Sequence, residues 1–364
     1  MIDRRHALLA AGAAVIGLAG AGWSGLRRMG TMAEYATDLA PLRAALPADP
    51  DPRDLVRFAT LAANSHNTQA WQFQIANGRI SILLDLARAT PIVDPDNHHL
   101  FISLGCAAEN LLLAAASRGL PGEVAFDPAA SALHFDYTQG AASDAGLSDA
   151  IPLRQSTRGF YDGSTLTAAE LGLLASAAQM PGVDLILLTD RPQITQVSDL
   201  IALGTTAQIA DPAFMRELKD WMRFNPRRAF YTGDGLFSAT SGNPAMPDWL
   251  GPSVLDWAYT AESENKKTAD KIASSAGLAV FVGAKEDPAH WVLVGRACQR
   301  FALQATAMGL KHAFLNQPIE IAELRPELAK LIGLSGRRPD LVLRFGRGAA
   351  MPYSARRPID AVLV

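Results

Sequence analysis

Ser65-His66-Asn67-Thr68-Gln69-Ala70-Trp71 and Arg154-Gln155-Ser156-Thr157-Arg158 are the two stretches that decide the fold of this chain. The first is a polar cluster between a helical pattern and an apolar run that begins at Trp71. Its Asn and Gln amides both donate and accept hydrogen bonds, so the cluster suits either a ligand or the turn that ends a helix. The second alternates basic and hydroxyl side chains, which suits either a phosphate group or a solvated loop. Each stretch alone is a weak signal.

Composition excludes some classes of partner. The chain has 364 residues, more than one hydrophobic core usually holds, so two subdomains are expected. A net charge of -3 gives no basic surface for nucleic acid, which favours a small-molecule partner. The two cysteines, Cys106 and Cys298, each lie in an Ala/Leu-rich helical pattern, which predicts buried free thiols rather than a disulfide.

The N-terminus has the pattern of an export signal. Arg4 and Arg5 precede a small apolar run, residues 7–22, that contains no acidic residue. This pattern is similar to a twin-arginine signal and predicts a periplasmic or exported protein, with residues 1–30 as signal or anchor. The run could also be a membrane tether or an ordinary buried helix, since it is short for a bilayer span.

The chain also resembles itself. Residues 105–120 align without gaps to residues 295–310, and both segments read as Ala-rich helices that end before a glycine. Upstream, two helical patterns end near Ala63 and Ala178. These repeats predict two homologous halves, residues 31–150 and 151–364. The segments at 105–120 and 295–310 lie further apart along the chain than the two helical patterns that end near Ala63 and Ala178. This difference predicts an insertion at about 200–275 in the second half.

Short apolar runs predict strands at residues 71–75, 80–84, 183–188, 278–282 and 341–345. Helices are expected at 167–178, which opens with a Thr167–Glu170 capping box, and at 322–331. Strands that alternate with helices indicate a layered α/β or α+β fold.

The insertion has its own pattern. Residues 211–224 look amphipathic, whereas residues 233–251 are rich in Gly, Pro, Asp and Ser with scattered Phe237, Met246 and Trp249. Its large apolar residues favour a lid that docks on something, and a peripheral decoration is the alternative.

Together the two stretches resemble segments of the nitroreductase-like flavoproteins. Residues 63–73 are similar to that family's Pro/Ala-Ser-x-x-Asn-x-Gln-Pro-Trp-x-Phe segment, and residues 153–160 to its Arg-x-Ser-x-Arg-x-Phe opening. Residues 343–346 and 356–359 are similar to its last strand and basic closing segment. The resemblance covers about residues 51–364 and is greatest to the Acg-type branch, in which one chain holds both halves. It implies an α+β nitroreductase-like fold, with a mixed sheet and flanking helices in each half, and FMN as the cofactor.

The resemblance also implies a set of FMN contacts from both halves of the chain. Those from the second half would hold the phosphate, the pyrimidine edge and the flavin ring, and those from the first half would reach across to the same flavin. The implied contacts are Arg154, Ser156, Arg158, Ser65, Asn67, Gln69, Leu315, Asn316, Arg356 and Arg357.

Departures from the family pattern predict one site per chain. Ala70 stands where the family has Pro. Residues 48–53 lack the Arg-x-Ser-x-Arg opening, and residues 179–183 lack the Asn/Gln segment. Each half therefore keeps only one of the two contributions, which predicts a single FMN and a monomer.

Other kinds of site are not supported by the sequence. His98 and His99 are adjacent in an expected loop, unlike the i, i+4 spacing of helical zinc ligands, so no metal site is predicted. His66, inside the polar cluster, is the one histidine considered for substrate contact, and no acid–base residue is assigned. No Gly-x-Gly-x-x-Gly follows a strand, and no Gly-x-Ser-x-Gly appears.

Two functions remain open at this stage. The first is an FMN oxidoreductase that passes hydride or electrons from a reduced donor to a small acceptor, a nitroaromatic or a quinone. The second is a protein that sequesters or stores FMN beneath a closed lid. Export favours the second or an unknown donor, because NAD(P)H is not expected outside the cytoplasm.

Overall fold

The computed structural model describes residues 28–143 and 146–364. The predicted twin-arginine segment and the possible membrane tether at residues 7–22 lie outside these residues. Within them, one helix, α4 (His98–Ala116), is long and apolar enough to cross a membrane, but it is largely buried in the protein interior.

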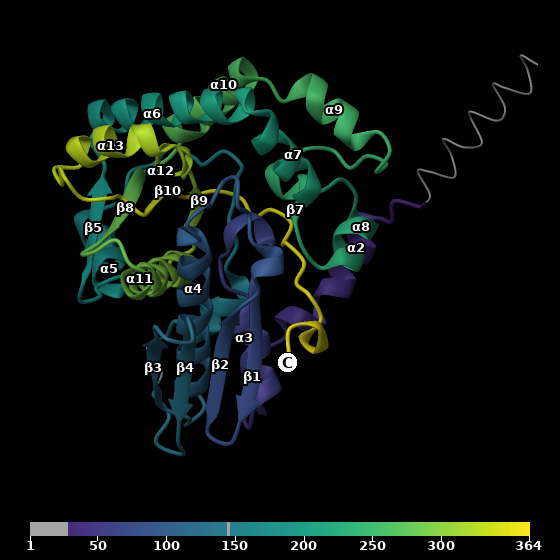
Figure 1. Cartoon of the computed structure of the whole chain (residues 1–364), viewed down its shortest axis with the longest axis vertical. Coiled ribbons are helices and arrows are strands. Elements are labelled where there is room, and N and C mark those ends of the chain that lie inside the picture. Colours follow the sequence, from purple (N-terminus) through teal and green to yellow (C-terminus); the bar gives the residue numbers. More distant parts are fainter. Residues whose placement is uncertain (1–27, 144–145) are drawn as a thin grey trace, which may run out of the picture.

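A first four-stranded sheet is formed by β1 (Trp71–Ala76), β2 (Arg79–Leu84), β3 (Gly122–Asp127) and β4 (Ala132–Tyr137). Its strand order is β1-β2-β4-β3, and every pair is antiparallel. Helix α3 (Pro52–Thr60) precedes β1, and α4 connects β2 to β3. Figure 1 shows this sheet in the lower part of the molecule, with α4 rising from it.

A second four-stranded sheet is formed by β5 (Val183–Leu188), β8 (Gly277–Gly283), β9 (Lys311–Phe314) and β10 (Leu341–Gly346). Its order is β5-β8-β10-β9, so the two sheets have the same order when their strands are counted along the chain. Helix α5 (Ala168–Ala177) precedes β5, and α11 (Pro288–Ala307) connects β8 to β9. The predicted capping box at Thr167 is present. The mixed α+β fold class is confirmed.

All five predicted strands are present, whereas β3, β4 and β9 were not predicted. The second sheet is covered on both faces. On β8, Leu278, Val280 and Val282 pack in a cluster with α6 (Arg191–Ala210), whereas Ala279 and Phe281 pack in the cluster that contains α11. A strand that is buried on both faces reads as a continuous apolar run, which is why β8 was easily predicted. Strand β3 is exposed or half-buried throughout and carries no such signal.

Helices α4 and α11 cross in very close contact at two glycines. A Cβ atom on Gly105 would lie 2.1 Å from the Val292 carbonyl oxygen, and one on Gly295 would lie 2.0 Å from the Ile102 carbonyl oxygen. Only glycine permits this approach of two backbones. The Cys106 thiol donates to the Gly295 carbonyl at 3.2 Å, and both cysteines are free and buried, as predicted.

The second half carries a long segment between β5 and β8, where the first sheet has only a two-residue turn. This segment is residues 189–276 and includes the predicted insertion at about 200–275. It contains α6, α7 (Pro212–Trp221), β6 (Met222–Arg223), α8 (Pro226–Thr232), β7 (Leu236–Phe237), α9 (Gly251–Ala258) and α10 (Ala261–Ala273). The remaining helices are α2 (Met32–Leu39), α12 (Gln317–Glu320) and α13 (Arg325–Leu331).

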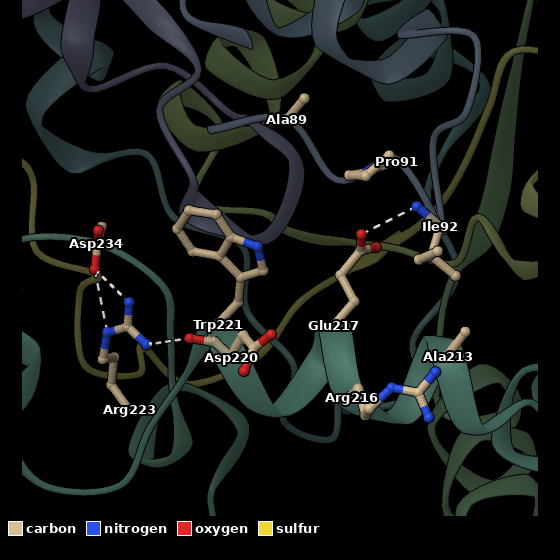
Figure 2. A pocket seen from close by; sticks show the side chains of 10 residues that line it. All are labelled: Ala89, Pro91, Ile92, Ala213, Arg216, Glu217, Asp220, Trp221, Arg223 and Asp234. Atoms are coloured by element: carbon tan, nitrogen blue, oxygen red, sulfur yellow. Dashed lines mark hydrogen bonds and ion pairs between the residues drawn. The ribbon is translucent and has the colours of Figure 1, made fainter. Parts of the chain in front are cut away.

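Residues 189–276, named the inserted segment below, contact residues 88–93 through polar groups. Figure 2 shows Glu217 of α7 accepting a hydrogen bond from the Ile92 amide, and it also accepts one from the Val93 amide. In the same view Arg223 of β6 donates to one carboxylate oxygen of Asp234. The other oxygen of Asp234 pairs with Arg88 of the first half. Burial alone would raise the pKa of Asp234, but the hydrogen bonds and charges of Arg223 and Arg88 outweigh it and hold the pKa below the usual range.

Candidate functional site

A cavity of about 700 Å³ lies where α4, the inserted segment and the chain around β9 and α12 meet. Its size falls within the ~300–1,000 Å³ typical of small-molecule sites. Five predicted site residues line it: Ser65, His66, Arg158, Leu315 and Asn316.

The polar cluster of the first half adopts an unusual backbone. Residues 65–67 form a short 3₁₀ turn, and His66, Asn67 and Gln69 all have positive φ, from 47° to 54°. Such angles are uncommon for residues other than glycine and are kept only where surrounding contacts enforce them. The turn directs successive side chains to different partners. Ser65 and His66 face the cavity, and burial there lowers the pKa of His66 to about 4, with Arg158 as a second cause.

Asn67 and Gln69 are not among the residues that line the cavity, and their contact with the cofactor stays a prediction. The Asn67 amide donates to the Gly235 and Ala355 carbonyls, at 3.2 and 3.1 Å. Gln69 donates to the Gly233 carbonyl at 2.8 Å and accepts from the Arg357 amide at 2.9 Å. Both side chains thus tie the inserted segment and the C-terminal tail to the first half.

Arg356 and Arg357 are also placed away from the cavity lining. Arg356 donates to the carbonyls of Thr60, Leu61 and Ala62 at the C-terminal end of α3, and to the Asn67 amide oxygen. A cation at a helix C-terminus satisfies free carbonyls and complements the helix dipole. Arg357 contacts the Gln69 carbonyl, Asp85 and Ala361. These contacts indicate a structural role for both arginines, and their closing on a phosphate stays a prediction.

Arg154 is buried with unused hydrogen-bond donors. Its Nη2 donates to the Leu61 carbonyl at 2.9 Å, whereas Nε and Nη1 have no partner among the described residues. His312, which is fully buried, likewise has two ring nitrogens without a partner, and burial beside Arg154 lowers its pKa to about 3. Buried donors without acceptors are costly, so this region suits an acceptor-rich ligand.

Ser156 is half-buried and pairs through its backbone with His312, and its side chain does not line the cavity.

Arg158 and Lys271 are cations of the cavity wall whose charged groups have no partner among the described residues. Across the described ranges, neither side chain has a hydrogen bond or ion pair. Burial lowers the pKa of both, and the second cause for each is Arg344, which also lines the cavity. Arg344 itself is engaged, because it donates to the Gly159 and Lys271 carbonyls and stacks 4.0 Å over the Tyr161 ring.

Leu315 and Asn316 reach the cavity because β9 pairs with β10. The Leu315 amide donates to the Val342 carbonyl at 2.8 Å, and the Asn316 side chain accepts from the Val342 amide at 3.0 Å. These bonds hold the turn after β9 against the sheet edge. Asn316 thereby precedes α12, which ends at Glu320.

A second polar region of the cavity was not predicted. His99, Glu320 and Gln208 line it from α4, α12 and α6, and Gln208 donates to Glu320 at 2.5 Å. His99 Nδ1 lies 3.9 Å from Glu320, and its Nε2 has no partner within the described residues. The sequence offered no signal for this group, because its members lie on three separate helices.

His98 and His99 form the first turn of α4 and do not lie in a loop, contrary to expectation. With Asp94 they form a buried group whose candidate ligand atoms lie within 4.8 Å of one another. Most of these atoms have protein partners: Asp94 accepts from the His99 and Leu100 amides, and His98 bonds Asp340 at 2.7 Å. The group is thus a hydrogen-bonded helix start, and we assign no metal to it.

Comparison with known proteins relates the chain to nitroreductases. No family model matches it. It is 24% identical over 325 residues to a protein of Mycobacterium tuberculosis H37Rv named "Putative NAD(P)H nitroreductase", a match that covers 85% of this chain and 90% of the relative. A protein of the same name from strain CDC 1551 matches equally.

Two solved structures show weaker similarity. One is a nitroreductase with bound FMN from Bacteroides fragilis, at 14% identity and a TM-score of 0.36, covering 57% of this chain and 90% of that one. The other is an oxidized iodotyrosine deiodinase bound to FMN and 3-iodo-L-tyrosine, at 14% identity and a TM-score of 0.38, covering 58% of this chain and 95% of that one.

Proposed function

We propose that this protein is an FMN-dependent oxidoreductase of the nitroreductase type. It transfers hydride or electrons from a reduced donor to a small organic acceptor, a nitroaromatic or a quinone. The observation that carries the proposal is the 700 Å³ cavity, whose wall holds the free cations Arg158 and Lys271. The similarity to the mycobacterial relative, over 85% of the chain, supports it.

The residues present fit an FMN. Its phosphate needs cationic donors, which Arg158 and Lys271 offer in the cavity wall. Its ring and ribityl hydroxyls need a mixed apolar and polar wall, which Ser65, His66, Leu315 and Asn316 offer. When bound, the flavin would supply the hydride and electron transfer, and the chain binds it, orients it and limits its contact with water.

The two sheets belong to two homologous halves fused in one chain, as in the Acg-type branch. Three observations support this: the shared strand order, the equivalent places of α4 and α11, and the reciprocal contacts at their crossing. Gly105 meets Val292 while Gly295 meets Ile102, and both pairings are related by a shift of 190 residues. Reciprocal contacts of this kind are typical of an isologous dimer interface. One chain then forms one site and functions as a monomer with a single FMN.

A second function, FMN sequestration, is favoured by one observation. Residues of the inserted segment, among them Phe214, Leu218, Phe237 and Tyr259, line the cavity, so the segment acts as a lid. Phe237 is buried there, as the closed-lid hypothesis requires, whereas Trp249 is 71% exposed. The Ile92 amide donates to Glu217 (Figure 2), Arg88 pairs with Asp234, and Asn67 donates to the Gly235 carbonyl, and these bonds hold the lid on the first half. A lid fixed in this way would restrict the access of a nicotinamide to the flavin.

Export through the twin-arginine pathway, to the periplasm or beyond, rests on residues 4–22 alone. An exported enzyme would need a reductant other than cytoplasmic NAD(P)H. A membrane tether at residues 7–22 would bring it close to membrane-borne donors.

The test is an absorbance spectrum of the purified protein, followed by anaerobic addition of NADPH or NADH. One FMN per chain that bleaches rapidly supports the oxidoreductase. An FMN that resists both donors and bleaches only with dithionite supports sequestration or another donor. A protein that stays colourless after reconstitution with FMN would contradict both functions.

A further inference from the structure

The cavity wall carries two chemically different groups of side chains. One group is the cations Arg158 and Lys271. The other is an imidazole, a carboxyl and an amide, from His99, Glu320 and Gln208. The first group is complementary to a phosphate, so the second is available to the reacting partner of the flavin.

Glu320 is a largely buried carboxyl group in the cavity wall, and its side chain is 15% exposed. From α6, Gln208 donates to it at 2.5 Å, and from α4, His99 Nδ1 lies 3.9 Å away. Asp94 before α4, Glu217 of α7 and Tyr259 after α9 are the other titratable groups that face it. No lysine or arginine in the described part of the chain pairs with Glu320, although two other carboxylates are close.

This environment favours the neutral acid. Burial is the main cause that raises the pKa of Glu320, and the Asp94 and Glu217 carboxylates add to it, whereas His99 and Gln208 oppose it. A buried carboxyl without a cationic partner retains its proton to higher pH than an exposed one. Carboxyl groups of this kind are suited to general acid catalysis near neutral pH.

We propose that Glu320 is the general acid that protonates the acceptor during its reduction, with His99 and Gln208 as its positioning residues. This inference rests on the proposed function. A two-electron reduction of a quinone takes up one hydride and one proton to give the hydroquinone. Reduction of a nitro group to a nitroso group takes up one hydride and one proton and releases water.

In both cases the hydride originates from a reduced nicotinamide or an equivalent donor, and Glu320 supplies the proton. The Glu320 O–H bond breaks, a new O–H bond forms on the acceptor, and the carboxylate regains a proton from solvent. Because His99 is next to the carboxylate, its imidazole favours the transient charge.

The test uses the full-length FMN-loaded protein with Glu320→Gln, which keeps the shape and removes the titratable proton. Glu323→Gln is the matched control, since Glu323 lies three residues further on and is exposed. Rapid-mixing absorbance measures flavin bleaching by the donor and, separately, re-oxidation by a benzoquinone. General acids contribute about 10²–10⁴-fold, so we expect re-oxidation to slow by about 100-fold in Glu320→Gln, with FMN content and bleaching within about 2-fold.

The pH profile provides a sharper readout. Re-oxidation of the wild type should slow as pH rises through the Glu320 pKa, and this limb should be absent in Glu320→Gln. Gln208→Leu removes a hydrogen bond that favours the charged form, so the limb should move to higher pH. Glu323→Gln should keep the wild-type profile.

A third readout does not depend on turnover. As the pH is lowered, the infrared spectrum of the protein without FMN should gain a protonated-carboxyl band at a higher pH than exposed carboxyl groups produce, and Glu320→Gln should lack this band. Wild-type re-oxidation rates and pH profile in Glu320→Gln would overturn the inference while leaving the proposed function intact. A wild type that binds no FMN would overturn the proposed function, and the general-acid role with it.

Discussion

Arg158 and Arg356 were both expected to contact the cofactor, yet the structure uses them in opposite ways. Arg356 gives its donors to carbonyls at the end of α3 and to Asn67. Arg158 has no protein partner within residues 28–143 and 146–364 and lines the cavity. A guanidinium whose donors are all used stabilises the fold, whereas one whose donors are free is available to a ligand. Arg154 is intermediate, with one bonded and two unpartnered nitrogens.

The largest expected effect comes from Arg356→Met. It leaves several carbonyls at the end of α3 without a donor, so we expect the free energy of unfolding to fall by roughly 4 kcal/mol. Urea denaturation measures this. Arg53→Met on the same helix is the control, because Arg53 is half exposed and its ion pair is with the exposed Asp360, so its loss should have little effect on stability. Equal stability of the two variants would refute the structural role of Arg356.

The helix crossing gives the next largest effect. Gly295→Ala places a methyl group against the Ile102 carbonyl, and overpacking of this kind costs about 1–3 kcal/mol. Gly172→Ala in α5 is the opposite case, since nothing lies within 4 Å of its added methyl group. It should stabilise the protein by roughly 0.5–1 kcal/mol. Thermal unfolding of both variants checks the two signs.

Arg158→Ala should act on the ligand and not on the fold. We expect FMN binding to weaken by about 2 kcal/mol, roughly 30-fold in Kd, because a charge-assisted phosphate contact is lost. Unfolding of the protein without FMN should be unchanged within about 0.5 kcal/mol. The half-exposed Arg347, which pairs with Glu170, serves as the control, and Arg347→Ala should keep wild-type affinity for FMN. Unaltered FMN affinity in Arg158→Ala would remove Arg158 from the site.

The smallest effect concerns pH and the buried His98–Asp340 pair. Burial lowers the pKa of His98 to about 3 and raises that of Asp340 to about 6. Between pH 4 and 6 the folded pair holds one proton, on Asp340, and the unfolded pair also holds one, on His98. The pair therefore adds almost no pH dependence to stability.

Single substitutions should separate the two contributions. In Asp340→Asn only His98 remains, and stability should rise with pH from about 3 to 6.5, because the unfolded state binds more protons. In His98→Gln only Asp340 remains, and stability should fall as pH rises from about 4 to 6. Urea denaturation across this range gives both slopes. Parallel slopes in the two variants would show that the two groups do not share a proton in this way.

Much of the frame was predictable from local pattern. The strands at 71–76, 183–188 and 341–346 follow from apolar runs, and the Thr167 capping box marks the start of α5. Strand β3 was not predicted, because an exposed edge strand needs no apolar run. Within the site, Ser65, His66 and Arg158 reach the cavity as expected, whereas Asn67 and Gln69 do not.

The sequence by itself determined the α+β layout, the buried free cysteines and the two stretches that flank the site. These properties depend on neighbouring residues and on apolar periodicity. The tertiary structure alone decided which polar side chains face the cavity. Asn67 bonds Arg356, 289 residues further along the chain, and Glu320 meets His99 and Gln208 only when three helices pack. A buried polar group must find its partner wherever the fold brings one, and local sequence does not show where that is.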